Sequence, residues 1–175
     1  EAYCDTAPAG TLSPIDMANP QVLRYRTFSK AYGMAGARIG YCVGEAGLIA
    51  AFDKVRNHYG INRVGQIGAL AALQDQDYLT HAIGLIARAR TRITRVAADN
   101  GLAALPSATN FVAIDCGRDA AFARRILEET LARDVFIRMP GTAPLNRCIR
   151  VTAGMDAEVE LFAEVLPLAK RAAHG

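Results

Sequence analysis

Residues 27–40, with the sequence T-F-S-K-A-Y-G-M-A-G-A-R-I-G, combine one lysine, two hydroxyl residues and one arginine with three glycines. A strand-forming run at residues 22–28 leads into Lys30, and a second apolar run occupies residues 38–43. We therefore expect two strands joined by a glycine-rich turn that carries the lysine. Neither run alternates clearly between apolar and polar residues, which predicts strands buried in a parallel or covered sheet.

The side chains of this turn suit a ligand that carries both an aldehyde and a phosphate. A lysine adds to an aldehyde, forming a Schiff base, when burial or a nearby cation favours its neutral amine. Thr27 and Ser29 supply hydroxyl donors and Arg38 supplies a planar charged fork, and such groups hold a phosphate. Together with Lys30 they indicate pyridoxal phosphate. The alternative is a strand, a turn and a strand whose lysine and arginine are merely solvated.

The same segment resembles the cofactor-lysine motif of the fold-type-I pyridoxal-phosphate enzymes, most closely the histidinol-phosphate aminotransferase-like branch of the class I/II aminotransferases. The resemblance implies that Lys30 carries the cofactor covalently and that Thr27, Ser29 and Arg38 hold its phosphate. It also implies an α/β fold, the C-terminal part of a fold-type-I transferase. Such a part contains a parallel-rich sheet of the large domain and a small α/β domain.

The chain begins at Glu1-Ala2-Tyr3, without a methionine. In the resembling family, an aspartate before the matching glutamate binds the pyridine nitrogen of the cofactor, and the tyrosine matching Tyr3 binds the ring oxygen. Neither that aspartate nor the family's N-terminal phosphate loop has a match here. We therefore expect these residues to be the C-terminal half of a longer enzyme, and to be inactive alone because the ring nitrogen lacks its carboxylate.

The pattern along the chain divides it into three regions. Residues 1–76 are expected to be the C-terminal part of the large cofactor-binding domain. Residues 77–100 form an amphipathic helix that the resemblance identifies as a link between domains. Residues 101–175 are expected to be a small C-terminal domain.

Shorter elements are expected within these regions. Two helices precede the linking helix, at residues 45–56 and 62–74. The last region follows the order β-α-β-β-α. Its expected strands are residues 110–115, 135–138 and 148–151, and its helices are capped by Asp119 and Asp156.

Arg150 is a further candidate site residue, in the segment C-I-R-V-T-A-G. An arginine in an apolar strand must find an anionic partner or face water. One alternative is a strand-edge arginine that pairs with a nearby carboxylate of the protein. The segment resembles the family's R-x-T/S-x-G strand, which implies that Arg150 binds the α-carboxylate or an equivalent acidic group of the substrate.

The resemblance implies a pyridoxal-phosphate-dependent aminotransferase. Such an enzyme moves an amino group between an amino acid, or an amino acid-like phosphate such as histidinol phosphate, and a 2-oxo acid. Lys30 would also move the proton as general base and acid. Two alternatives remain open: a decarboxylase or lyase of the same fold, and a non-enzymatic module that senses pyridoxal phosphate.

Composition supplies the remaining expectations. A net charge of +3 with 21% charged residues gives no reason to expect a nucleic-acid or membrane partner. The four cysteines lie far apart without C-x-x-C spacing, which indicates reduced core residues of a cytoplasmic protein. The three histidines share no ligand spacing, so no metal site is expected. By analogy with the family, we expect a homodimer.

Overall fold

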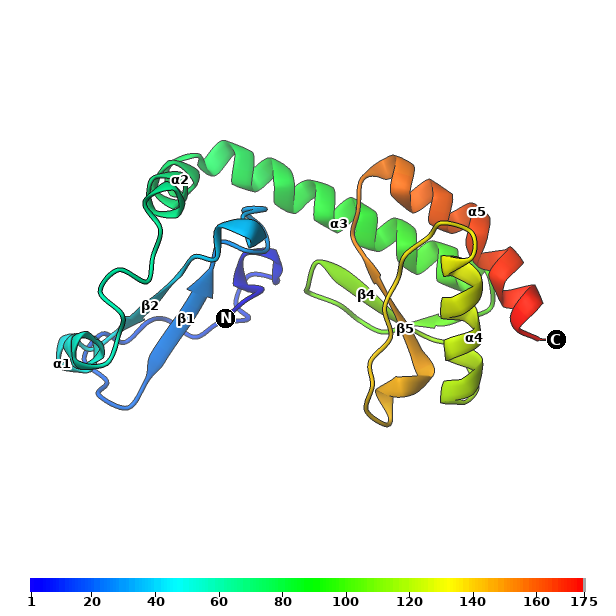
Figure 1. The fold of residues 1–175 in the computed structure, drawn as a ribbon, viewed down its shortest axis with the longest axis horizontal. Coiled ribbons are helices and arrows are strands. Elements are labelled where there is room, and N and C mark those ends of the chain that lie inside the picture. The colour runs from blue at the N-terminus through cyan, green and yellow to red at the C-terminus, as the bar shows by residue number, and fades with distance from the viewer. Residues whose placement is uncertain (175) are drawn as a thin grey trace. The chain divides into compact units, whose positions relative to one another are not determined.

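The computed structural model describes residues 1–174, which divide into two compact units. The first unit is Glu1–Ile83 and the second begins at Gly84. The boundary falls inside one long helix, α3 (Gln76–Asp99) (Figure 1). The expected linking helix is therefore confirmed as a helix to within one residue at each end.

The first unit contains one small sheet and several short helices. Its elements before α3 are η1 (Cys4–Thr6), β1 (Leu23–Thr27), η2 (Ala35–Ala37), β2 (Gly40–Gly44), α1 (Ala46–Ala51), η3 (Phe52–Lys54) and α2 (Arg63–Gln74). Both helices expected before α3 are present. The first of them tightens into η3 at Phe52, and the second begins after Asn62, whose side chain accepts the Gly65 N–H at 2.6 Å.

The strands β1 and β2 are present but differ from the expectation in burial. They pair antiparallel, with Leu23 opposite Gly44 and Thr27 opposite Gly40. Tyr25 and Tyr41 are exposed. The prediction of buried strands is thus wrong for the described residues, in which both strands are only partly buried and Arg24 and Arg26 pair with Glu1 rather than packing against apolar groups.

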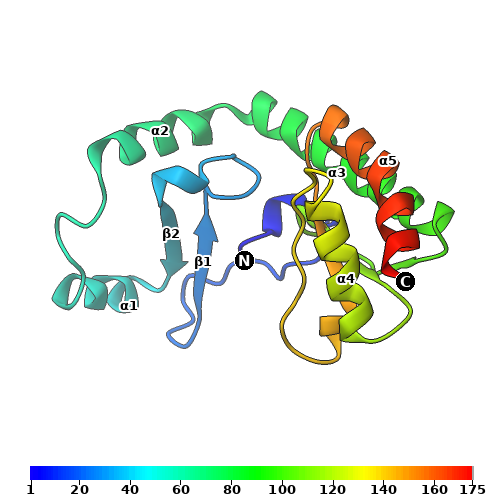
Figure 2. The ribbon, with the colours of Figure 1, turned by 45° about the vertical axis from the view of Figure 1, so that its right-hand side comes forward.

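The second unit packs helices on one face of a three-stranded antiparallel sheet (Figures 1 and 2). After α3 its elements are β3 (Ala103–Ala104), β4 (Phe111–Asp115), α4 (Ala120–Leu131), η4 (Leu145–Arg147), β5 (Cys148–Thr152) and α5 (Asp156–Ala173), and the strand order is β3-β4-β5. The core joins alternate residues of β4 and β5 to the apolar sides of the helices. Its most buried large side chains are Ile93, Val112, Ile114, Phe122, Ile126, Ile149, Phe162 and Leu166.

Two details of the second unit differ from the sequence expectations. No strand forms at residues 135–138, where only Arg138 bridges to Arg150. The segment alternates correctly, with Val135 and Ile137 buried and Phe136 exposed, but it turns away at Pro140 after this single bridge. A short strand, β3, was not expected.

Of the two expected helix caps in the second unit, the cap on α4 is confirmed and the cap on α5 is wrong. Asp119 caps α4 as expected, accepting the Phe122 N–H at 2.9 Å. Asp156 is instead the first residue of α5, and the cap is Met155. The Glu158 carboxylate accepts the Met155 N–H at 2.8 Å, so the carboxylate that closes this cap lies within the helix.

The cysteines are free thiols. Cys116 and Cys148 are buried and the other two are half-buried. Burial raises the pKa of Cys116 to about 11, so it stays protonated at neutral pH. Across residues 1–174, no helix is long and apolar enough to cross a membrane.

Candidate active site

The turn between β1 and β2 holds Lys30 in a defined backbone. The Phe28 N–H donates to the Ile39 carbonyl at 3.2 Å, and the Met34 N–H donates to the Phe28 carbonyl at 2.9 Å. The Gly33 N–H donates to the Lys30 carbonyl at 3.0 Å. Gly33 has φ +69°, a conformation that glycine adopts readily and other residues rarely do.

A second glycine lets the two strands approach closely below this turn. A Cβ atom on Gly40 would lie 2.5 Å from the Arg26 carbonyl oxygen, which no side chain tolerates. Phe28 is buried at the same level, and its ring lies 4.8 Å from that of Tyr32 and 5.7 Å from that of Tyr41. These contacts fix the base of the turn.

The two predicted hydroxyls lie together at the end of β1. Thr27 Oγ1 donates to Ser29 Oγ at 2.9 Å and accepts the Ser29 N–H at 3.1 Å. Thr27 Oγ1 also lies 3.5 Å from the Ile39 carbonyl oxygen, to which it can donate, so the Thr27 hydroxyl has two acceptors for its one proton and either hydroxyl can be the donor in the pair. Both side chains are half-buried. The pair can therefore present a donor to an anion without rearranging the strand.

Tyr3 and Lys30 are distant in sequence but close in the structure. The Lys30 Nζ atom lies 5.4 Å from the centre of the Tyr3 ring, within the range of a cation–π contact. The buried Thr6 fixes the backbone at Tyr3, because its N–H and its hydroxyl both donate to the Tyr3 carbonyl, at 3.2 and 3.1 Å. Two of the predicted site residues are thus brought together from separate segments.

An ion-pair cluster at Glu1 was not expected from the sequence. The Glu1 carboxylate pairs with Arg24 and with Arg26 Nε, the latter at 3.1 Å. Hydrogen bonds with Tyr41 and Glu1 raise the pKa of the Arg26 guanidinium. In the sequence, the feature that points to this cluster is the i, i+2 spacing of the two arginines, which places both on one face of β1. The cluster attaches the first residues of the chain to this strand.

Arg38 lies on the far side of the same turn. Its backbone is left-handed, with φ 55° and ψ 46°, which is uncommon for a residue other than glycine. Its Nη1 atom donates to the Ala35 carbonyl at 2.8 Å, and its side chain is exposed. Backbone strain of this kind concentrates at ligand-binding sites. If an anion bound here, the Arg38 guanidinium would exchange its contact with a neutral carbonyl for a contact with a charged group.

Arg150 belongs to the second unit. It lies in β5 opposite Ala113, and its guanidinium lies 4.8 Å from the centre of the Phe111 ring. Within residues 1–174, no carboxylate lies at ion-pair distance from it, so the alternative of a carboxylate-paired strand-edge arginine does not hold there. The half-buried guanidinium can accept an anionic ligand.

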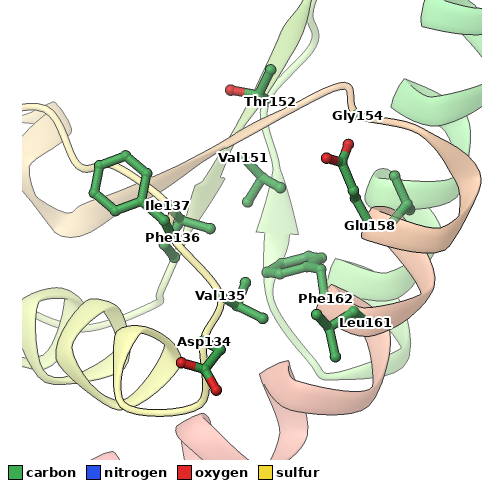
Figure 3. A pocket seen from close by; sticks show the side chains of 11 residues that line it. Asp134, Val135, Phe136, Ile137, Val151, Thr152, Gly154, Glu158, Leu161 and Phe162 are labelled. Carbon is green, nitrogen blue, oxygen red and sulfur yellow. The ribbon is translucent and has the colours of Figure 1, made fainter.

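A cavity of about 360 Å³ in the second unit contains none of the predicted site residues. It lies between residues 134–137, which follow α4, and the start of α5 (Figure 3). Apolar side chains such as Phe136 and Phe162 line most of it, and Asp134 and Glu158 lie at its edge. The Glu158 carboxylate accepts the Met155 N–H and so serves the start of α5.

Comparison with known proteins decides the family. Residues 1–166 match the family model described as aminotransferase class I and II. The chain belongs to this family. As an aminotransferase-family chain it has the α/β fold of the fold-type-I transferases, as the resemblance implied.

The similarity extends along nearly the whole chain. A crystal structure of histidinol-phosphate aminotransferase from Sinorhizobium meliloti, in complex with pyridoxal-5′-phosphate, is 57% identical with a TM-score of 0.95 and covers 98% of this chain. The histidinol-phosphate aminotransferase of Gluconacetobacter diazotrophicus is 35% identical over 170 residues, or 95% of this chain. This chain spans 47% of the length of each of these two proteins.

Proposed function

We propose that the protein is a pyridoxal-phosphate-dependent aminotransferase. It would move an amino group between an amino acid, or a phosphate such as histidinol phosphate, and a 2-oxo acid. One observation carries the proposal: the half-buried Lys30 amine lies against the Tyr3 ring, on the turn that also bears the Thr27–Ser29 hydroxyl pair and Arg38. The pyridoxal-5′-phosphate complex of the Sinorhizobium meliloti relative supports the choice of cofactor.

The donor set on the turn fits this cofactor. An aldehyde needs an amine, which Lys30 supplies, and a phosphate needs hydroxyl donors and a cation, which Thr27, Ser29 and Arg38 supply. The Tyr3 phenol would donate to the ring oxygen. All five residues belong to the first unit, so the proposed cofactor site lies within one compact body.

The side chains divide the proposed chemistry among them. Bound pyridoxal phosphate supplies an electrophilic carbon and an electron-accepting ring. Lys30 Nζ would hold that carbon at rest, then take the proton from the substrate Cα and later return a proton. Arg150 would bind the acidic group of the substrate and so select which bond at Cα is broken. Loss of a proton gives amino transfer, whereas loss of a carboxyl group would give a decarboxylase.

The alternatives from the sequence have weaker support. A decarboxylase or lyase of the same fold would use the same lysine, and a sensing module would bind the cofactor without turnover. The relatives above are both named as aminotransferases, which supports amino transfer. An assay that follows consumption of the amino acid and of the 2-oxo acid, together with carbon dioxide release, separates the three possibilities.

We also propose a cytoplasmic homodimer. Free thiols at all four cysteines support a reducing compartment. Support for a partner surface comes from α2, where exposed apolar side chains lie along the helix: Val64, Ile67, Leu70 and Leu73.

Two arginine substitutions in the complete enzyme test the proposed division of roles. Arg38→Ala should weaken pyridoxal phosphate binding, and Arg150→Ala should instead raise the KM for the acidic substrate. Each effect should be roughly ten- to hundredfold, because a hydrogen bond to a charged group contributes about 1.5–3 kcal/mol. Cofactor titration and substrate kinetics measure the two effects separately.

The matched control is Arg124→Ala, which removes an exposed arginine of α4. It should change neither constant. If Arg150→Ala lost cofactor affinity and kept substrate affinity, the two roles would have been assigned the wrong way round.

A further inference from the structure

Asn62 contacts the cofactor-lysine turn from a different element. Its Oδ1 atom accepts the Gly65 N–H at 2.6 Å and so caps α2. Its Nδ2 atom donates to the Ala37 carbonyl at 3.2 Å, across 25 residues of sequence. Because a carboxamide is both acceptor and donor, one side chain can join the start of α2 to η2.

The start of α2 also packs closely against this turn. Gly65 is buried, and a Cβ atom there would lie 3.3 Å from the Ala37 oxygen. Three residues further on, a Cβ atom on Gly68 would lie 3.1 Å from Met34 Cε. The contact between α2 and the turn therefore involves more than one exposed hydrogen bond, and it lies inside the first unit.

The carbonyl that Asn62 holds belongs to the peptide group that precedes Arg38. The Ala37 oxygen and the Arg38 nitrogen lie in one rigid plane, so holding the oxygen fixes the orientation of the peptide plane from which the φ angle of Arg38 is measured. That angle is 55°, in the sparsely populated left-handed region. The neighbouring Ala35 carbonyl is held by Arg38 itself. The anchor from Asn62 thus acts where the turn is most strained.

We infer that Asn62 is a positioning residue that holds Arg38 in the conformation that binds the cofactor phosphate. The inference rests on the proposed function, because it assumes that Arg38 contacts that phosphate. Asn62 itself touches the turn only through the Ala37 backbone. Its loss should therefore affect ligands that carry a phosphate and spare those that do not.

Two substitutions remove the donor to Ala37 and keep the cap on α2. Asn62→Ser is neutral and too short to reach the Ala37 oxygen while capping, and Asn62→Asp has an acceptor in place of the donor. Serine and aspartate both cap helices well. Each variant is titrated with pyridoxal phosphate and, separately, with pyridoxal, which has the aldehyde but no phosphate.

Both variants should bind pyridoxal phosphate roughly three- to tenfold more weakly, the effect of one net hydrogen bond. Both should bind pyridoxal with an affinity within about twofold of that of the parent protein. When either substitution is added to Arg38→Ala, it should lower pyridoxal phosphate affinity by no more than about a further twofold. Thermal unfolding, followed in parallel, should show at most the small loss of stability expected for one exposed hydrogen bond.

Several results would overturn the inference. Equal losses for both ligands, or a loss of stability larger than one hydrogen bond contributes, would mean that Asn62 acts on the fold rather than on Arg38. A loss in Asn62→Asp alone would mean that the added charge, not the missing donor, acts on the phosphate. Unchanged pyridoxal phosphate affinity in both variants would also refute it. If the parent protein bound neither ligand at Lys30, the proposed function itself would fail, and the inference with it.

Discussion

In the complete enzyme, Lys30→Ala should reduce amino transfer by at least roughly 10²- to 10⁴-fold, the contribution of one positioned acid–base group. The loss should be larger still, because the same amine would also hold the cofactor. The side chain is half-buried and contacts the Tyr3 ring, and no salt bridge within residues 1–174 involves it. Its removal should therefore leave the fold intact, which circular dichroism checks.

The other lysines cannot take over this role. Lys54 ends η3, and the Lys170 Nζ atom donates to the Asn100 carbonyl in the second unit. Lys54→Ala is the matched control and should keep parental activity. Lys30→Arg keeps the positive charge and should be as inactive as Lys30→Ala. Turnover within tenfold of the parent in either Lys30 variant would show that the amine is not the catalytic group.

Phe122→Ala should destabilise the protein by about 3–5 kcal/mol, the usual effect of removing a large buried aromatic side chain. Phe122 is 1% exposed and lies at the centre of the second unit. Its ring also lies 4.8 Å from the Arg118 guanidinium and 4.8 Å from the His174 ring. The substitution therefore removes ring contacts as well as apolar burial.

Urea unfolding, followed by circular dichroism, measures this effect. Phe136→Ala is the control, because Phe136 is 72% exposed and its loss should change the free energy of unfolding by less than about 0.5 kcal/mol. Equal effects of the two substitutions would contradict the described core of the second unit.

The sequence predicted most of the helices and the local part of the site. Apolar spacing located α2 and α3, because the period of a buried helix face is set within the helix itself. The hydroxyl pair and Arg38 follow from one continuous segment, so their presence beside Lys30 needs no knowledge of tertiary structure. Tyr3 could be associated with Lys30 only through the family resemblance.

Pairing between distant segments was less predictable. Residues 135–138 alternate like a strand, yet they make one bridge to β5 before the chain turns at Pro140. The direction of pairing between β1 and β2 was left open, since a run of strand-forming residues does not encode its partner. The links from Glu1 to β1 and from Asn62 to Ala37 each span about 25 residues, and no local pattern announces them.

The covalent attachment point of the cofactor tests the central claim most directly. The protein is incubated with pyridoxal phosphate, reduced with borohydride, digested and mapped by mass spectrometry. Reduction fixes a lysine-bound cofactor as a stable amine, and the chain has only three lysines, Lys30, Lys54 and Lys170. We expect the phosphopyridoxyl mass on the peptide that contains Lys30. Label on Lys54 or Lys170 instead, or on no lysine at all, would contradict the account.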